Sequence, residues 1–176
     1  MLPKILDRLD SERRKSFAFI YVDPFGLGDP PVIMETLRRV LERDYTELFI
    51  QLTVDGLIRV SGWLPHRYSQ DEAKRKKAES FCNTLRLIIG DDRIDEFCKE
   101  WERWREGEKE TKALQYYISG LTKYFLHVEY VGIPLDSARP VYYLVYTTRN
   151  DTGRRIMQGI ITKAKRRGSE TLERFF

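Results

Sequence analysis

The sequence predicts an α/β fold with an open mixed sheet, in which two parallel strands precede an antiparallel pair and a helical insertion separates the two pairs. Residues 17–22 form a continuous apolar run, and a second apolar run at 47–54 follows a stretch with helical periodicity. Strand, helix and strand in this order indicate a right-handed parallel crossover. Two further strand-like segments, near 125–130 and at 141–148, are too close in sequence for a crossover helix and should pair antiparallel.

Length and charge limit the organisation of the chain. The 176 residues are expected to form a single α/β domain over 1–176, with the helical insertion at about 56–123. The net charge of +4, from 31 Lys and Arg against 27 Asp and Glu, is compatible with an anionic partner such as nucleic acid. Solvated helix surfaces explain the same basic clusters. These clusters are Arg13 to Lys15, Lys74 to Lys77, and Lys163 with Lys165, Arg166 and Arg167.

The cysteines and the length of the apolar runs indicate where in the cell the protein is located. Cys82 and Cys98 occupy apolar positions of expected helices, which favours buried free thiols over a disulfide or a zinc site. No metal is therefore expected. Acidic residues interrupt the N-terminus, and no apolar run reaches the roughly 18 residues that span a bilayer. We expect no membrane partner and a cytoplasmic location.

The first strand leads directly into a candidate site. Six apolar or aromatic residues without polar alternation, Phe17–Val22, are typical of a central strand that is covered on both faces. Pro24 ends this strand, and Gly26 permits a tight turn. Ligands of open α/β sheets bind just outside the carboxyl ends of strands, so Asp23 is the first functional candidate.

Apolar periodicity predicts the remaining helices. A short amphipathic helix precedes the first strand, and Asp29 is expected to cap a second helix that starts with Pro30 and Pro31. Between 56 and 123 the pattern is helical, with a break at Gly62-Trp63-Leu64-Pro65. Aromatic residues at helical spacing are interpreted there as core and not as a base-stacking platform. The expected inward residues are Leu2, Ile5, Leu6 and Leu9; Ile33, Leu37, Val40 and Leu41; Ala78, Phe81, Cys82, Leu85, Ile88 and Ile89; Ile94, Phe97, Cys98, Trp101 and Trp104; and Leu114, Tyr117, Ile118 and Leu121.

The C-terminal part predicts the antiparallel pair and a last helix. Leu126, Val128 and Tyr130 are expected on the drier face of the third strand, and Val141–Thr148 forms the fourth. Asn150 or Asp151 is expected to cap a helix that ends near Gly168. The inward residues of this helix are expected to be Ile156, Met157, Ile160, Ile161 and Ala164.

Three blocks of the sequence resemble the three-Cys-motif partner (TcmP) family. They are Phe19-Ile20-Tyr21-Val22-Asp23-Pro24-Phe25-Gly26, the segment Glu47–Leu52 followed by Asp55–Arg59, and Tyr142–Arg149 followed by Gly153 and Met157. The expected strand order is similar to the C-terminal half of the Rossmann-like class I S-adenosylmethionine-dependent methyltransferase fold. The turn at Asp23 falls where that fold carries its (Asp/Asn/Ser)-Pro-Pro-aromatic motif.

The resemblance implies roles for the residues of this turn. Asp23 would orient and polarise an amino group, Pro24 would present its carbonyl, and Phe25 would stack on an extruded base. Gly26 would allow close approach and is the candidate cofactor-binding residue. The resemblance also makes Gln51 and Arg59 candidates for contact with substrate or partner. S-adenosylmethionine is the implied cofactor.

The sequence departs from the family in three respects. Gln51 stands where the family usually has Asn, Phe25 replaces the second proline, and the glycine-rich loop and acidic residue of the cofactor-binding half have no counterpart. We therefore expect a piece of a longer protein or a short natural form that needs a partner. The edge of the Phe17–Val22 strand should be covered by the 2–9 helix, a second copy or a missing segment.

Two functions fit the sequence. The first is an amino-group methyltransferase, active only when a missing half or partner completes the cofactor site. The second is a non-catalytic module on a methyltransferase-like scaffold that binds nucleic acid or protein. Basic clusters would serve the second function through salt-sensitive contacts.

Overall fold

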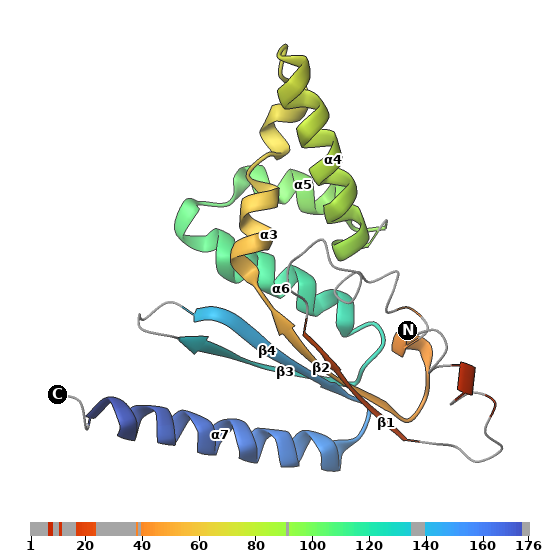
Figure 1. Cartoon of the computed structure of the whole chain (residues 1–176), viewed down its shortest axis with the longest axis vertical. Helices are drawn as coiled ribbons and strands as arrows, with labels where there is room; N and C mark the ends of the chain where they lie inside the picture. The colour runs from red at the N-terminus through yellow and green to blue at the C-terminus, as the bar shows by residue number, and fades with distance from the viewer. Residues whose placement is uncertain are drawn as a thin grey trace.

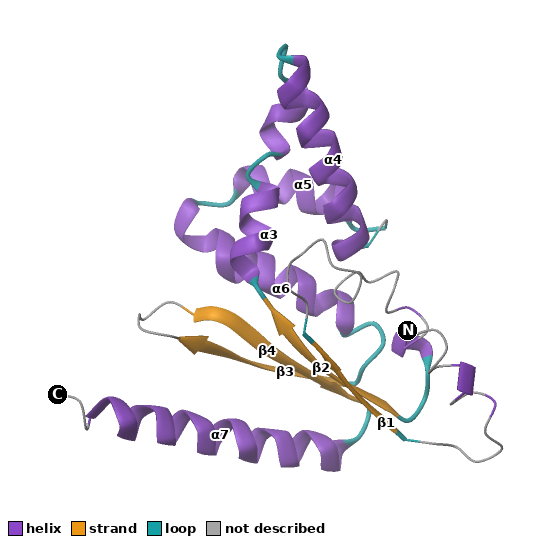
Figure 2. Ribbon diagram, in the orientation of Figure 1, coloured by secondary structure: helices purple, strands orange, loops and turns teal. Residues whose placement is uncertain are grey.

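The computed structural model describes residues 7, 8, 11, 17–23, 38, 40–90, 92–134 and 140–173, with the side chains of 134, 140, 141 and 164–173 left out. Within these ranges the chain is an α/β structure with an open four-stranded mixed sheet (Figures 1 and 2). The expected α/β class is thereby confirmed. The strands are β1 (Ala18–Val22), β2 (Thr46–Leu52), β3 (His127–Pro134) and β4 (Pro140–Thr148).

The strand order in the sheet is β1-β2-β4-β3. β1 and β2 are parallel, with Ile20 level with Leu48, and β4 lies antiparallel to both β2 and β3. The predicted parallel pair and antiparallel pair are both present. Because β4 inserts between β2 and β3, the last strand of the chain joins the two pairs into one sheet.

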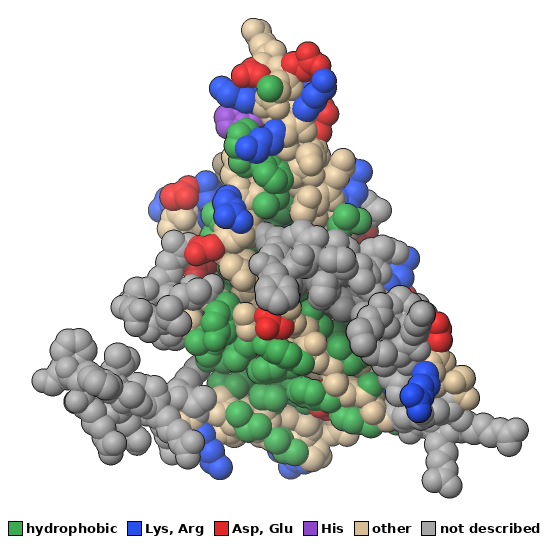
Figure 3. Space-filling model, in the orientation of Figure 1, with side chains coloured by type: hydrophobic (Ala, Val, Ile, Leu, Met, Phe, Trp, Pro, Cys, Tyr) green, Lys and Arg blue, Asp and Glu red, His purple; other side chains and the backbone are tan. Residues whose placement is uncertain are grey.

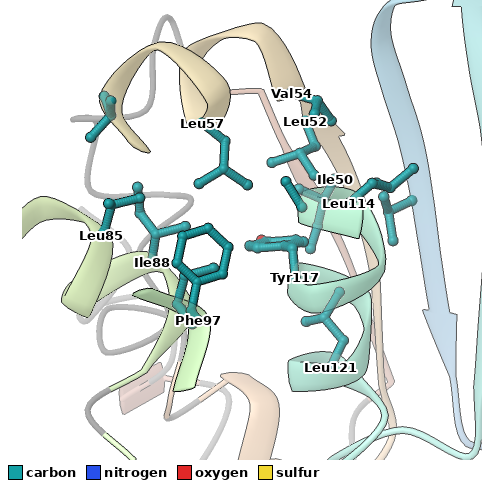
Figure 4. Close-up of a cluster of buried hydrophobic side chains, with 14 of the residues drawn as sticks. Ile50, Leu52, Val54, Leu57, Leu85, Ile88, Phe97, Leu114, Tyr117 and Leu121 are labelled. Atoms are coloured by element: carbon teal, nitrogen blue, oxygen red, sulfur yellow. The ribbon is translucent and has the colours of Figure 1, made fainter. Parts of the chain in front are cut away.

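One face of the sheet carries the main hydrophobic core. Alternate residues of β2 point into it and are fully buried, because side chains of a strand alternate between faces. These are Leu48, Ile50 and Leu52. The helices of the insertion pack against this face, and the ring of Tyr117 lies at the centre of their contact with Leu57 and Phe97 (Figure 4).

The insertion consists of α3 (Val54–Ser61), η2 (Leu64–Tyr68), α4 (Glu72–Ile89), α5 (Ile94–Arg103), η3 (Glu106–Glu108) and α6 (Lys109–Leu121). The predicted break is confirmed, since α3 ends at Ser61 with Gly62 as its C-cap, and Pro65 lies in the first turn of η2. Asp71 caps α4 by accepting the amides of Ala73 and Lys74. α4 and η2 extend away from the sheet and form the tip of the molecule (Figure 1).

On the opposite face of the sheet, α7 (Asp151–Glu173) packs mainly against β3 and β4. Asn150 is the residue that caps this helix, as its side-chain oxygen accepts the amides of Thr152 and Gly153. Glu129 on β3 accepts hydrogen bonds from Arg154 and from Gln158, both at 2.8 Å. These contacts hold α7 on the β3 side of the sheet.

The predicted core of the insertion is largely confirmed. Val40 and Leu41 of the second expected helix are also buried. Most residues of the three stripes have exposed fractions below a tenth, whereas Phe81, Cys82 and Ile118 are half-buried. Both cysteines are free thiols. The other expected inward residues near the N-terminus, Leu2, Ile5, Leu6, Leu9, Ile33 and Leu37, lie outside the described residues, as do Asp29 and the prolines that follow it.

Five expectations for the C-terminal part are wrong. Leu126 precedes β3 and is 69% exposed, and Tyr130 is 41% exposed. On α7, Ile156 and Ile160 are 60% and 53% exposed, because the helix turns Gly153, Met157 and Ile161 toward the sheet. α7 also continues beyond Gly168 to Glu173. A single glycine costs a helix only about 1 kcal/mol and does not have to end it.

Candidate functional site

The carboxyl ends of β1 and β2 bring two predicted site residues together. Asp23 directly follows β1 and is exposed. Val22 is level with Ile50 in the parallel pair, so the next residues, Asp23 and Gln51, lie side by side at this end of the sheet. Tyr21 joins them, since its hydroxyl donates to Oε1 of Gln51 at 3.1 Å. Partial burial raises the pKa of Tyr21, and the carboxylate of Asp23 raises it further. The cluster offers a carboxylate, an amide and a phenol that can bind an amine.

The other predicted site residues are not brought into this cluster. Arg59 lies exposed in the last turn of α3. Among the described residues it forms no hydrogen bond or ion pair with Asp23 or Gln51. Pro24, Phe25 and Gly26 lie outside the described residues.

β1 is an edge strand in the described sheet, and it exposes a row of aromatic side chains. Phe17, Phe19 and Tyr21 are 61%, 53% and 51% exposed. The rings of Phe19 and Tyr21 lie 6.4 and 5.8 Å from the ring of Phe49 on β2. Hydrophobic side chains gather over the sheet in the space-filling view, between the insertion and α7 (Figure 3). Exposed apolar surface of this kind marks interaction sites.

The prediction that this strand is central and covered on both faces is therefore wrong for the described sheet. Ala18 and Val22 are buried against the core, but the alternate residues face water. The sequence held a signal for this difference. Aromatic residues occupy positions 17, 19 and 21, and aliphatic residues occupy 18, 20 and 22.

Hydrogen bonding assigns a direction to each residue of β1. The amide of Ala18 donates to the carbonyl of Tyr45, at the start of β2, at 2.9 Å. Backbone groups of successive strand residues point to opposite sides, so the N–H and C=O groups of Ile20 and Val22 also point toward β2. The N–H and C=O groups of Phe19 and Tyr21 consequently point away from β2. The exposed aromatic residues are thus the same residues that present the outer backbone groups of the edge.

A pocket of about 370 Å³ opens at the amino end of β1 and β2, opposite Asp23. It is lined by Phe17, Asp44, Tyr45, Thr46, Glu47, Thr148, Arg149 and Asn150. Arg149 donates to the carbonyls of Arg43 and Leu41 and lies 4.5 Å from the Phe125 ring centre, so it acts as a structural tie. Burial lowers the pKa of Arg149. Glu47 likewise accepts the hydroxyl of Thr148 at 2.7 Å, so the polar groups of this pocket serve the fold.

The tip of the insertion combines aromatic and basic side chains. Tyr68 is 81% exposed, with the guanidinium of Arg67 5.6 Å from its ring centre. The ammonium of Lys77 lies 4.2 Å from the ring centre of Trp63. Arg67 and Tyr68 lie on η2, Trp63 directly precedes it, and Lys77 lies on α4. The sequence singled out Lys77 within the basic cluster at 74–77, but it did not single out Trp63, Arg67 or Tyr68. Their signal would have been the aromatic residues at 63 and 68, close in sequence to this cluster.

Among the described residues, no group of three or more His, Cys, Asp or Glu side chains is placed to hold a metal ion. In the same part of the chain, no helix has the length and apolar character needed to cross a membrane.

Comparison of the chain with family models, with curated proteins and with solved structures finds no match.

Proposed function

We propose that this chain is an interaction module on a methyltransferase-like half-scaffold, and that it works with a partner that pairs with the outer edge of β1. The observation that carries this proposal is the coincidence, on one strand, of exposed aromatic rings with outward-pointing backbone groups. Addition of a strand to an open edge is a common mode of protein recognition, in which main-chain hydrogen bonds supply affinity and side chains supply specificity.

The strand order supports the scaffold part of this proposal. An antiparallel β4 between β2 and β3 is the order expected for the C-terminal half of a Rossmann-like methyltransferase sheet. The sequence blocks similar to the TcmP family include β1, β2 and β4. In such a scaffold the β1 edge is where a cofactor-binding half would continue the sheet.

The residues present do not by themselves fit S-adenosylmethionine. Asp23 is exposed and Tyr21 is half exposed, and both side chains lie on the solvent-facing side of β1. No glycine-rich loop or second acidic residue of the expected kind is available in the sequence to hold the cofactor. Methyl transfer to an amine is therefore proposed only for an assembly in which a partner completes the site beside Asp23 and Gln51.

Amide hydrogen exchange of the dilute monomeric chain tests the interaction role. The amides of Ala18, Ile20 and Val22 point toward β2 and should be protected. Those of Phe19 and Tyr21 point away from β2 and should exchange at least about a hundredfold faster. Equal protection of all five amides would mean that the edge is already paired within the chain, and the proposal would then fail.

Calorimetric titration with S-adenosylmethionine tests the cofactor part. We expect no saturable heat for the isolated chain. Micromolar binding that an Asp23→Ala variant weakens would instead show a cofactor site complete without a partner. An Asp95→Ala variant, which removes an exposed carboxylate on α5, is the matched control.

A second candidate function is binding of single-stranded nucleic acid at the tip, favoured by the exposure of Tyr68 beside Arg67. Exposed aromatic rings stack on bases, and nearby cations contact phosphates. Fluorescence anisotropy with a labelled single-stranded oligonucleotide would test it. A Tyr68→Ala variant should bind about tenfold more weakly, whereas Tyr130→Ala on β3 should not change the affinity. Equal affinities for the two variants would remove this candidate.

A further inference from the structure

We infer that the partner on the β1 edge is a second copy of this chain, paired antiparallel with β1 about a twofold axis at Phe19. The inference rests on the proposed interaction role of β1 and names its partner.

Backbone direction limits the registers that are available. In a twofold antiparallel pair, opposed residues lie on the same face, and hydrogen-bonded pairs form only between residues whose backbone groups point outward. On β1 these are Phe19 and Tyr21, and Phe17, two residues before Phe19, has the same backbone direction by alternation. Pairs centred on Phe19 use all three residues, and each hydrogen-bonded pair exchanges two N–H···O bonds.

Side-chain pairing favours the axis at Phe19 over its neighbours. This register sets Phe17 opposite Tyr21 of the second copy and Phe19 opposite its own counterpart. Every exposed aromatic ring then gains an aromatic cross-strand neighbour, a favourable type of pair. An axis at Ile20 would instead set Phe17 opposite Asp23, and an axis at Tyr21 would set Phe19 opposite Asp23.

Charge does not oppose pairing in this register. Residues 17 to 22 carry no charge, so no like charges meet along the pair.

The other face of β1 would also gain cover. Ala18 of one copy would lie opposite Ile20 of the other, and Ile20 is only partly buried against the core of its own chain. The four-stranded sheets of the two chains would join into one continuous sheet, in which β1 is no longer an edge strand. Second copies often cover open sheet edges in this way, because pairing satisfies the outer backbone groups.

Disulfide cross-linking measures the register directly. In a Phe19→Cys variant the two introduced residues would face each other with Cα atoms about 5.5 Å apart, within the range for a disulfide. In a Tyr21→Cys variant they would be about 13 Å apart along the strands. We expect the oxidant diamide to convert most of the first variant, and little of the second, to a covalent dimer on a non-reducing gel. The native chain, with free Cys82 and Cys98, is the background control.

Charge substitutions provide a test that does not depend on thiols. A Phe17→Glu, Tyr21→Lys double variant opposes unlike charges across the axis, and Phe17→Lys, Tyr21→Lys opposes like charges, with equal loss of aromatic surface. Sedimentation equilibrium should show association of the first variant at least about tenfold tighter than that of the second. Circular dichroism spectra of the two variants should agree, which separates association from folding.

Two results would overturn the inference. One is a native chain that remains monomeric at high concentration while its Phe19 and Tyr21 amides exchange freely; this leaves the interaction role of β1 intact and excludes the second copy. The other is equal cross-linking of the two cysteine variants, which would indicate random collision. Protection of these amides in the dilute monomer would contradict the proposed function itself.

Discussion

The two edges of the sheet are built in opposite ways. At the β3 edge, Glu129 is held by Arg154 and Gln158 of α7, and the pairing with β4 shifts register between Ile133 and Pro134. Charge, an overlying helix, proline and an irregular register are the features by which proteins protect sheet edges from further pairing. Among the described residues, Ala18–Val22 of β1 carry no charge and no proline, pair with β2 in regular register, and expose aromatic rings. The described fold therefore protects the β3 edge and leaves the β1 edge able to accept a strand.

The largest expected effect separates the inner from the outer side of β1. An Ile20→Pro substitution removes an amide that addresses β2 and should lower the free energy of unfolding by roughly 2–3 kcal/mol, because a buried ladder group loses its partner. A Phe19→Pro substitution removes an outward amide and should cost less than about 1 kcal/mol in the dilute chain.

Urea unfolding of the two proline variants at low protein concentration measures this difference. The Phe19→Pro variant should also fail to associate at high concentration. Equal destabilisation by both prolines would contradict the assignment of inner and outer residues, and with it the contrast between the two edges.

The next effect concerns the close approach of α7 to the sheet. A Cβ atom at Gly153 would lie 2.5 Å from Oε1 of Glu47 and 2.8 Å from the hydroxyl of Tyr146. We expect Gly153→Ala to destabilise the chain by about 2 kcal/mol, since overpacking forces side chains or the helix to shift. Gly159→Ala has nothing within 4 Å and should stabilise α7 by up to about 1 kcal/mol.

Thermal melting of the two alanine variants tests the role of α7. The opposite signs are the diagnostic result, because both substitutions raise helix propensity in the same helix. A stabilising Gly153→Ala would mean that α7 is not seated against Glu47 and Tyr146, and the β3 half of the sheet would be less well covered than we describe.

A smaller effect tests the anchor of α7 on the β3 edge. Glu129→Ala removes the acceptor for Arg154 and Gln158 and should lower the free energy of unfolding by about 1–2 kcal/mol. Amide exchange in the first turns of α7 should increase. Arg155→Ala, one residue from the anchor, should change stability by less than about 0.5 kcal/mol; a larger change there would locate the anchor elsewhere.

The smallest effect distinguishes the ring of Tyr21 from its hydroxyl. Tyr21→Phe keeps the aromatic surface and removes the hydrogen bond to Gln51, so the cost should be below about 1 kcal/mol. Association through β1 should not change, because the proposed pairing uses the ring and backbone. Sedimentation equilibrium that shows loss of association would indicate that the hydroxyl contributes to the interface.

Much of the fold followed from local patterns. The apolar stripes of the insertion predicted its core, because a helix that buries one face must repeat apolar residues at helical spacing. The errors on α7 arose from reading Ile156 and Ile160 by the same rule. The helix rests on the sheet through Gly153, Met157 and Ile161, so which flank of an amphipathic helix is buried depended on its partner.

The candidate site was less accessible to prediction. Asp23 and Gln51 were chosen separately, and their adjacency depends on the parallel register of β1 and β2. Arg59 was selected by its place in a sequence block, but α3 turns it to solvent. Tyr21 was missed as a site residue, because a tyrosine in an apolar run gives no sign that its hydroxyl will reach Gln51.

The sequence by itself determined the strand and helix types, the apolar partition of the insertion and the end of β1 at Asp23, since these depend on neighbours close along the chain. Only the tertiary structure decided which edge is protected. Glu129 meets Arg154 and Gln158 across 25 and 29 residues, whereas the rings of Phe19 and Tyr21 on β1 pack against Phe49 of the adjacent strand. The physical reason is that exposure of a strand depends on what packs against each side of it, and those contacts come from segments far away in the sequence.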